Sequence, residues 1–401
     1  MKSYRPPNQV MITIQGSSII KFSFAVILFI FLLFSISGAL TALKPEYQLK
    51  SSSVNTVASN ITGGMLYQLL GWENHALMQS APENSSAPKL TNMMFALSTN
   101  VNLDDPRSLL GRELPGFYQF DGKILIAGEG TNYTNMPIES SPPLDILTAE
   151  KEATLQNTED VDDKDNNKST IPPLSTGKKK VVYIYFSHNT ESYLPYLKGV
   201  TDPNLAYHSK INVTKIGDRL KEDLEDRGIG TTLDKTDVQA ILKQKHKDFT
   251  ASYEESGKVV QAVLSKNHDL TYLIDIHRDA RRKSQTTIKI KGKSYAKVAF
   301  VIGSNNPNYE KNADFAGELH KILEKKYKGL SRGVLKQGGW RYNGKYNQQL
   351  SNKAILIEFG GVDNTFEELY RSADAIADAL SEYYWQAEKV NNPDKEKGSK
   401  E

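Results

Sequence analysis

Polar side chains that can bind a metal ion or move a proton follow three apolar stretches of the chain, each typical of a buried strand. The three pairs are Val181–Phe186 followed by His188, Tyr272–Ile276 followed by His277, and Ala354–Ile357 followed by Glu358. In open α/β sheets, ligands bind at the carboxyl ends of the strands. We therefore expect His188, His277 and Glu358 to lie close together at one edge of a sheet.

A fourth candidate, Glu191, follows His188 by three residues, a spacing that can aim both side chains at one point from a turn. Two neutral imidazoles and a carboxylate suit Zn²⁺, and a site with three protein ligands leaves an open position for water. A further carboxylate that does not bind the metal can act as general base toward that water. The pattern favours His188, Glu191 and His277 as ligands and Glu358 as the base.

Each of these histidines also has a simpler explanation, because a single histidine at a strand end is often a solvated or hydrogen-bonded residue. Asp275, in the middle of an apolar strand, is either a hydrogen-bond partner of a histidine or an edge residue. Four other histidines lie in polar or turn-like stretches or on a charged helix face, and we expect them at the surface. They are His208, His246, His268 and His320.

The amino-acid composition limits the kinds of catalytic and metal site that the chain can form. The chain has 401 residues, no cysteine and seven histidines. Disulfide scaffolds, thiol nucleophiles and cysteine-ligated metal sites are therefore excluded, and a transition metal must rely mainly on histidine and carboxylate ligands. The 50 basic residues against 47 acidic ones give a net charge of +3. This balance disfavours nucleic acid as the main partner, since no field of one sign would follow a phosphate backbone.

From about residue 180 the chain alternates strand-like and helix-like stretches, which is the pattern of an α/β fold. We expect further strands at 286–290 and 298–303, and helices at 211–227, 238–244, 253–266, 309–327 and 366–390. The strand runs are almost continuously apolar, as in a sheet covered on both faces. The sequence therefore predicts an α/β domain at 180–390, followed by a charged tail at 391–401.

An uncharged apolar run, Phe22–Leu43, stands near the N-terminus. As a helix it would span about 33 Å, enough for a hydrocarbon core of about 30 Å. Basic residues precede it, so the positive-inside rule places residues 1–21 in the cytoplasm and the bulk of the protein outside. A cleaved signal peptide is the alternative, although the run is longer than the usual signal-peptide core. We expect a single-pass membrane protein.

Two further regions separate this anchor from the α/β domain. Residues 44–140 predict a stalk and a small mixed region, in which 122–127 is strand-like and no chemistry is evident. Residues 141–179 are polar, acidic and punctuated by proline, and predict a flexible linker. The Asp/Asn run at 160–167 lacks the glycine and the terminal glutamate of an EF-hand calcium loop.

Three motifs of the α/β domain resemble those of the stage II sporulation protein P family. They are YIYFSHNTESY at 183–193, IDIHRD at 274–279, and YNQQLS at 346–351 followed by ILIEFGG at 355–361. The resemblance covers about residues 180–385. Three motifs in this order, together with an N-terminal anchor, form a specific pattern.

The resemblance implies a cell-wall hydrolase similar to zinc-dependent N-acetylmuramoyl-L-alanine amidases, with a mixed central sheet flanked by helices. It implies His188 and His277 as zinc ligands and Glu358 as the catalytic glutamate, acting on peptidoglycan, with endopeptidase cleavage of the cross-link as an associated activity. It also implies a place at the septal or engulfing membrane during sporulation. Stage II sporulation proteins D and M are the partners that it implies.

One feature departs from the broader amidase pattern, in which the ligand glutamate opens a helix some way after the first histidine. The corresponding helix here begins near 212–214 without a glutamate, so Glu191 is the nearest candidate. Arg278 and Gln348 stand within the site motifs and are candidates for substrate contacts. For Arg278, a solvent-facing salt bridge is the alternative.

Two other functions stay open on the residues alone. A zinc carboxypeptidase-like peptidase acting on stem peptides would use the same ligands. A non-catalytic, membrane-tethered scaffold that binds the cell wall would need neither the metal nor Glu358.

Overall fold

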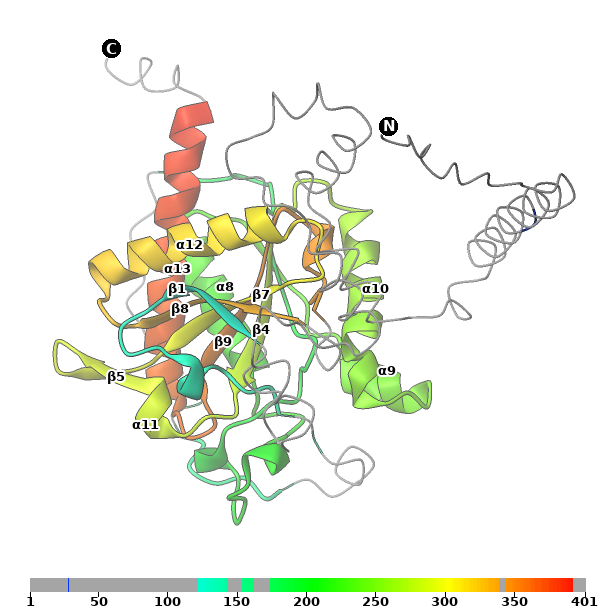
Figure 1. Ribbon diagram of the computed structural model, residues 1–401, viewed down its shortest axis with the longest axis vertical. Coiled ribbons are helices and arrows are strands. Elements are labelled where there is room, and N and C mark those ends of the chain that lie inside the picture. Colours follow the sequence, from blue (N-terminus) through cyan, green and yellow to red (C-terminus); the bar gives the residue numbers. More distant parts are fainter. Residues whose placement is uncertain are drawn as a thin grey trace, which may run out of the picture. The chain divides into compact units, whose positions relative to one another are not determined.

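The structure of the protein, a computed structural model, describes residues 122–140, 142, 153–159, 161, 174–338 and 344–391, together with Leu28. Apart from Leu28, these residues belong to one compact unit of the chain. Its centre is a seven-stranded sheet in the order β1-β8-β7-β9-β4-β2-β3 (Figure 1). The strands are β1 (Lys123–Ala127), β2 (Val182–Tyr185), β3 (Thr231–Leu233), β4 (Tyr272–Asp279), β7 (Val298–Gly303), β8 (Ser331–Gln337) and β9 (Lys353–Gly361).

The sheet is mixed. β9, β4, β2 and β3 run parallel to one another, whereas β7 runs antiparallel to β9. β8 runs parallel to β7, and β1 closes that side as an antiparallel edge strand. The four parallel strands end at the same edge, as the predicted cluster requires. A separate hairpin is formed by β5 (Thr287–Ile290) and β6 (Lys293–Ala296).

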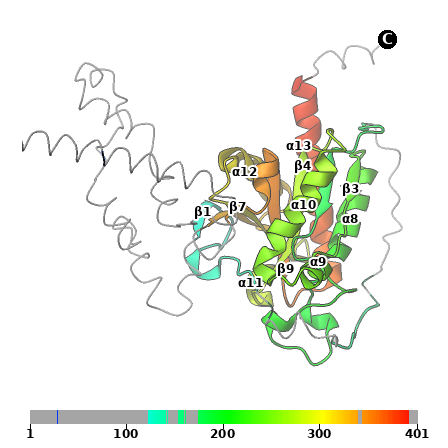
Figure 2. The same ribbon diagram turned by 90° about the vertical axis from the view of Figure 1, so that its right-hand side faces the viewer.

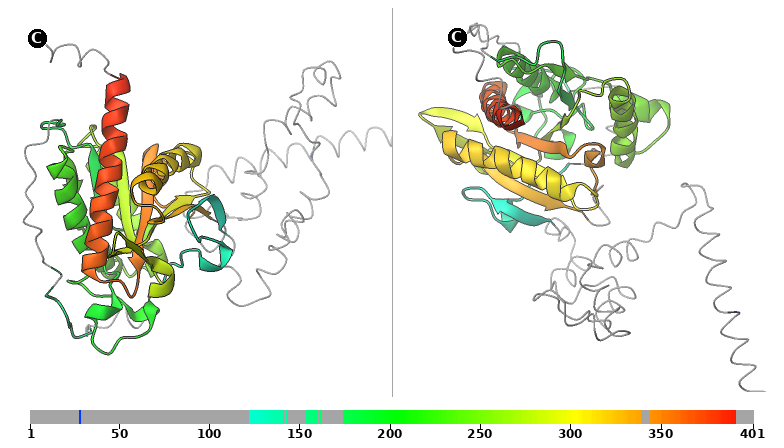
Figure 3. Two further views of the ribbon diagram at one scale, coloured as in Figure 1. Left: turned by 90° about the vertical axis from the view of Figure 1, so that its left-hand side faces the viewer. Right: turned by 90° about the horizontal axis from the view of Figure 1, so that it is seen from above.

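Helices cover both faces of the sheet (Figures 2 and 3). One face carries α8 (Thr214–Asp226), α12 (Tyr309–Lys326) and α13 (Phe366–Asn391), and the other carries α10 (Ser252–Leu264) with α9 (Val238–Gln244) beside it. The short helices are η3 (Tyr133–Asn135), η4 (Leu194–Tyr196), η5 (Pro203–Leu205), η6 (Phe249–Ala251), α11 (Lys283–Thr286) and η7 (Gln348–Leu350).

The alternation of side chains along the strands creates these two layers, since successive residues of a strand point to opposite faces. Ile184 of β2 and Ile274 of β4 pack in the core that α8, α12 and α13 complete. Tyr185 and Leu273, one residue away in each strand, pack with Val260 of α10 instead. The strands are therefore apolar at almost every position, and the prediction of an α/β sheet covered on both faces is confirmed.

The N-terminal boundary of this unit differs from the prediction. β1, which we had placed in a separate small region, pairs with β8 through Ile124 with Leu335 and Ile126 with Val334. The sequence of a five-residue stretch can predict that it forms a strand but not which strand it pairs with. The partner of β1 lies more than 200 residues later in the chain. Parts of the predicted linker also pack on this unit, since Tyr370 donates a hydrogen bond to the Val161 carbonyl.

The predicted membrane anchor at 22–43 lies outside the described residues, Leu28 excepted. Among the residues that are described, no helix has the length and apolar character needed to cross a bilayer. The anchor, the stalk and the charged tail beyond residue 391 therefore stay predictions.

Candidate metal centre

Three polar residues of β4 and β9 stand on the face of the sheet that α10 covers. Asp275 and His277 follow Leu273 at intervals of two in β4, and Glu358 follows Leu356 by two in β9. Residues at this interval share one face of a strand. His277 and Glu358 are direct partners in the register between the two parallel strands. The site is thus the polar end of an otherwise apolar sheet face.

His188 and Glu191 come from the turn that follows β2. The backbone N–H of Glu191 donates to the His188 carbonyl at 3.2 Å, which folds the chain back and brings the two side chains together. The Glu191 carbonyl accepts a hydrogen bond from Val213 N at 2.8 Å, immediately before α8. Glu191 therefore lies against the helix start at which the amidase resemblance expects a glutamate.

The Glu191 carboxylate lies between two imidazoles. Its Oε1 is 3.6 Å from His188 Nδ1, and its Oε2 is 3.6 Å from His277 Nδ1. All three side chains are buried, and one ligand atom from each lies within 4.8 Å of the others. Within the described part of the chain, His188 Nδ1 and Glu191 Oε1 have no hydrogen-bond partner.

These separations test whether a zinc ion fits. They are too long for hydrogen bonds. Two ligands of a tetrahedral zinc ion, each at about 2.1 Å from the metal, are about 3.4 Å apart, close to what is seen here. The donor set and the unpartnered atoms therefore fit Zn²⁺ held by His188, Glu191 and His277.

The negative charge around His277 also favours a bound cation. Burial by itself would lower the pKa of His277, but Asp275, followed by Glu191 and Glu358, raises it to about 10. Burial would raise the pKa of Glu191, yet His188, His277 and the nearby Arg278 together lower it. Without a metal, a proton on His277 supplies positive charge beside these carboxylates, and a bound cation would supply that charge instead.

Glu358, the predicted base, is 5% exposed. Its Oε2 lacks a hydrogen-bond partner among the described residues. Burial raises the pKa of Glu358 well above its usual value; His277 opposes this, and the carboxylates of Glu191, Asp279 and Glu139 add to it. A buried carboxylate with a raised proton affinity suits a group that takes up a proton and later returns it.

The two predicted substrate residues are both buried. Arg278 is fully buried, with Nη2 donating to the Ala206 carbonyl at 3.2 Å and its guanidinium over the Tyr207 ring. The alternative of a solvent-facing salt bridge is therefore wrong. Its backbone N–H donates to Glu191 Oε2 at 3.0 Å, so it orients that carboxylate.

Gln348 spans from η7 to β7. Its Oε1 accepts from Gly303 N at 3.0 Å and its Nε2 donates to the Val301 carbonyl at 2.8 Å. Both ends of the amide thus bond the backbone and hold the third motif against the sheet. A substrate contact of Gln348 stays a prediction.

Glu139, which no sequence motif predicts, is a further residue of the site. Its Oε1 lies 3.4 Å from His188 Nδ1 and accepts a hydrogen bond from the Tyr253 hydroxyl at 2.9 Å. Its side chain is 20% exposed, whereas those of Glu191 and His188 are 1% exposed. Only the folded chain brings Glu139 to the candidate metal ligands, so no local motif could have revealed it.

The segment that carries Glu139 is tied to the end of β4. Asp279 accepts a hydrogen bond from Ile138 N at 2.9 Å and forms a buried ion pair with Arg332 of β8. The Arg332 guanidinium also donates to the Asn135 carbonyl. These contacts fix the position of the neighbouring Glu139.

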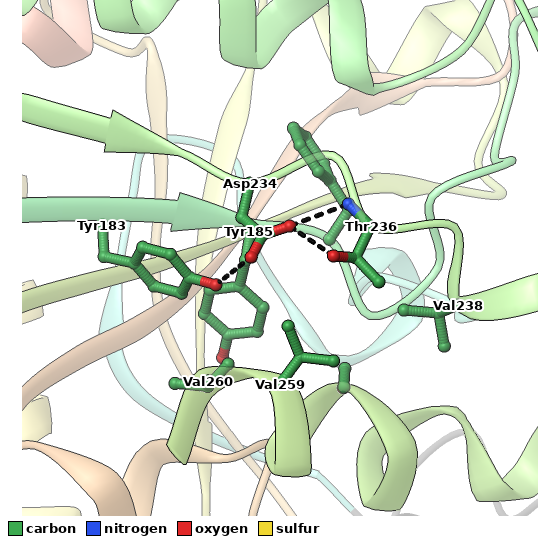
Figure 4. Close-up of a pocket in the computed structure, with 9 residues that line it drawn as sticks. Tyr183, Tyr185, Asp234, Thr236, Val238, Val259 and Val260 are labelled. Carbon is green, nitrogen blue, oxygen red and sulfur yellow. Dashed lines mark hydrogen bonds between the residues drawn. The ribbon is translucent and has the colours of Figure 1, made fainter. Parts of the chain in front are cut away.

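A small cavity of about 10 Å³ lies between β2 and α10 (Figure 4). The Tyr183 hydroxyl donates to Asp234 at 2.6 Å, and Asp234 accepts from both the backbone and the hydroxyl of Thr236. A cavity of this volume has room for about one water molecule and is too small for a substrate. The wall of this cavity includes Ser256, whose hydroxyl reaches Ser187 beside the metal centre.

Comparisons with known proteins cover nearly the whole chain. A family model described as Stage II sporulation protein P (SpoIIP) matches residues 104–381. Stage II sporulation protein P of Bacillus subtilis (strain 168) is 50% identical over 392 residues, which are 98% of each chain. The chain belongs to the stage II sporulation protein P family. The name of the family implies a role in sporulation.

The SpoIIP family match starts at residue 104, well before the predicted boundary at 180. This agrees with β1 belonging to the same sheet as the three motifs. A solved structure, Cwp6 from Clostridium difficile, is 20% identical with a TM-score of 0.31, over 51% of this chain and 29% of that chain. The chain thus spans less than a third of Cwp6, and at this TM-score the similarity has no bearing on fold or function.

Proposed function

We propose that this SpoIIP family member is a zinc-dependent N-acetylmuramoyl-L-alanine amidase. It would hydrolyse the amide between N-acetylmuramic acid and the L-alanine of the peptidoglycan stem peptide. The observation that carries the proposal is the convergence of His188, Glu191 and His277, with Glu358 paired in register beside His277. The resemblance of the motifs to zinc amidases supports the choice of substrate.

The residues of the site can perform this hydrolysis. A zinc ion would lower the pKa of a water molecule and polarise the amide carbonyl. Glu358 takes a proton from the attacking water as the oxygen–carbon bond forms. It then gives that proton to the alanine nitrogen as the carbon–nitrogen bond breaks. The products are the lactyl carboxylate of muramic acid and a stem peptide with a free amine.

We include cross-link endopeptidase activity as a second reaction of the same site. A peptide bond of the cross-link needs the same base and the same polarisation of its carbonyl. The resemblance to the family supports this addition.

The proposal also covers where the protein works. The run Phe22–Leu43 supports a single-pass anchor in the cell membrane, with the bulk of the protein outside the cytoplasm. The family resemblance supports the septal or engulfing membrane as the location, thinning of the septal wall as the task, and stage II sporulation proteins D and M as partners.

The experiment is hydrolysis of cell-wall sacculi by the full-length protein, with and without a zinc chelator, followed by mass spectrometry of the released fragments. We expect stem peptides that begin with free L-alanine, lost with chelator and restored by zinc. Glu358→Gln should lower the rate about 10²–10⁴-fold and leave zinc binding intact. Glu318→Gln, at an exposed position of α12, is the matched control and should retain the activity.

Other outcomes would contradict the amidase. Fragments with new amines only within the peptides would identify a carboxypeptidase-like or endopeptidase enzyme. Release of no fragment at any zinc concentration, also with stage II sporulation proteins D and M added, would identify a wall-binding scaffold.

A further inference from the structure

A continuous chain of buried hydrogen bonds leads from the third motif to Asp275, beside the metal centre. Asn347 Nδ2 donates to Ser256 Oγ at 2.9 Å, and Ser256 Oγ donates to Ser187 Oγ at 3.1 Å. Ser187 Oγ donates to Asp275 Oδ2. Asp275 Oδ1 lies 3.1 Å from His277 Nε2, an ion-pair contact in which the imidazole nitrogen is not aligned for a hydrogen bond. We call this series, from Asn347 to Asp275, the relay. All four of its residues are buried.

The donors and acceptors of the relay fix its direction. Each of the two serine hydroxyls has one proton to donate and receives one hydrogen bond, so the chain runs from the amide to the carboxylate. Ser187 also donates its backbone N–H to Asp275 Oδ1 at 2.9 Å. The Asp275 carboxylate therefore cannot turn without leaving buried donors unpaired. The other acceptor near Ser256 Oγ, the Tyr253 carbonyl, is farther away at 3.4 Å.

The start of the relay is held in an unusual backbone conformation. Tyr346 and Asn347 have φ values of 51° and 56°, in the left-handed region that side-chain-bearing residues seldom adopt. Gly257, on α10, makes room for the amide, because a Cβ there would lie 2.6 Å from Asn347 Oδ1. The packing of α10 against the third motif thus determines where the Asn347 amide stands.

We propose that Ser187, Ser256 and Asn347 are positioning residues of the metal centre. The relay fixes the Asp275 carboxylate, which attracts the Nε2 side of the His277 ring across 3.1 Å. Nδ1 on the other side of the ring then faces Glu191 and the proposed metal position. A carboxylate that fixes the ring of a histidine ligand strengthens metal binding. Here that carboxylate is itself set by side chains from the first motif, the third motif and α10. The inference rests on the proposed zinc site.

The test is the zinc affinity of the full-length protein, measured by competition with a chelator of known affinity. Ser187→Ala should weaken binding about 10–100-fold. Ser256→Ala should weaken it less and Asn347→Gly least, because each is one bond further from Asp275. Glycine at 347 keeps the left-handed backbone. Ser265→Ala, just after α10 with an exposed hydroxyl bonded to the Ala262 carbonyl, is the matched control and should bind zinc normally.

A double variant separates a relay from three independent supports. Ser256 acts only through Ser187, so Ser187→Ala/Ser256→Ala should bind zinc as weakly as Ser187→Ala alone. Losses that multiply would overturn the proposal. So would variants that melt at lower temperature in zinc-free buffer but keep the wild-type zinc affinity. If Ser187→Ala does not fold, Ser256→Ala combined with Asn347→Gly provides the same cycle.

The control with unaltered protein distinguishes the two proposals. A wild-type protein that binds no zinc overturns the proposed function and the relay together. A wild-type protein that binds zinc, with relay variants that bind it equally well, overturns the relay alone.

Discussion

Two regions of the α/β unit bury histidines, and the groups around those histidines differ between the two regions. At the carboxyl ends of β2 and β4, His188 and His277 face the carboxylates of Glu191, Asp275 and Glu139. Elsewhere, His320 of α12 is hydrogen-bonded through Nδ1 to the Ser331 hydroxyl of β8 at 2.8 Å.

His208 resembles His320 rather than the candidate metal ligands His188 and His277. Its Nδ1 accepts hydrogen bonds from Lys210 N at 3.0 Å and Ile211 N at 3.2 Å. His208 and His320 are 5% and 7% exposed, so the prediction that they lie at the surface was wrong. Burial alone therefore does not mark a functional histidine. What distinguishes His188 and His277 is that they face carboxylates, whose negative charge either a proton on an imidazole or a bound metal ion can neutralise.

The largest expected effect follows from replacing one histidine of each region by alanine. His277→Ala should weaken zinc binding more than about 100-fold, beyond what loss of an orienting partner causes. His320→Ala should leave the zinc affinity unchanged. Chelator competition, and the rise in melting temperature on adding zinc, measure both. Equal zinc affinities for the two variants would remove the distinction between the regions.

A smaller effect on zinc binding is expected from Glu139, the partly exposed carboxylate beside His188. Its carboxylate adds negative charge near His188, so Glu139→Gln should weaken zinc binding by about tenfold or less, because partial exposure screens the charge. Tyr253→Phe removes the hydroxyl that holds Glu139 and should have a smaller effect in the same direction. Zinc affinity that is unchanged or increased in Glu139→Gln would show that this carboxylate does not act on the metal.

The second region is expected to matter for stability instead. His320→Ala leaves the Ser331 hydroxyl with one buried partner fewer and should lower the free energy of unfolding by about 1–3 kcal/mol. Urea unfolding in zinc-free buffer measures the change. His268→Ala, at an exposed position, should stay within about 0.5 kcal/mol of wild type. A similar loss in both variants would mean that the buried hydrogen bond adds nothing.

The smallest effect is a dependence of stability on pH. Burial lowers the pKa of His320, although Glu324 partly opposes this. The unfolded chain then takes up the proton first, so stability falls as the pH drops below about 6.5, the value of a free histidine, through the folded-state pKa. His320→Ala should lack this part of the loss. Melting temperatures of both proteins between pH 7 and pH 5, with chelator present, give the difference, and parallel curves would contradict it.

Much of the fold could be predicted because its pattern is local. The predicted strand at 298–303 and helix at 238–244 coincide with β7 and α9. β8 could not be found in this way, since its sequence SRGVLKQ contains polar residues. Its arginine, Arg332, is buried only because Asp279 at the end of β4 pairs with it. Because a distant ion pair lets polar residues be buried in β8, the strand lacks the apolar run by which a strand is predicted from sequence.

The sequence by itself determined which groups stand at the ends of the strands. The step from apolar to polar residues after β2 and within β4 and β9 identified His188, His277 and Glu358, because strand direction and alternation follow from neighbouring residues. The tertiary structure alone decided that Glu139 approaches His188, that Arg278 is buried and that Asn347 connects to Asp275. Those contacts join segments that lie far apart in the chain, and their pairing is set by the packing of whole elements rather than by any local pattern.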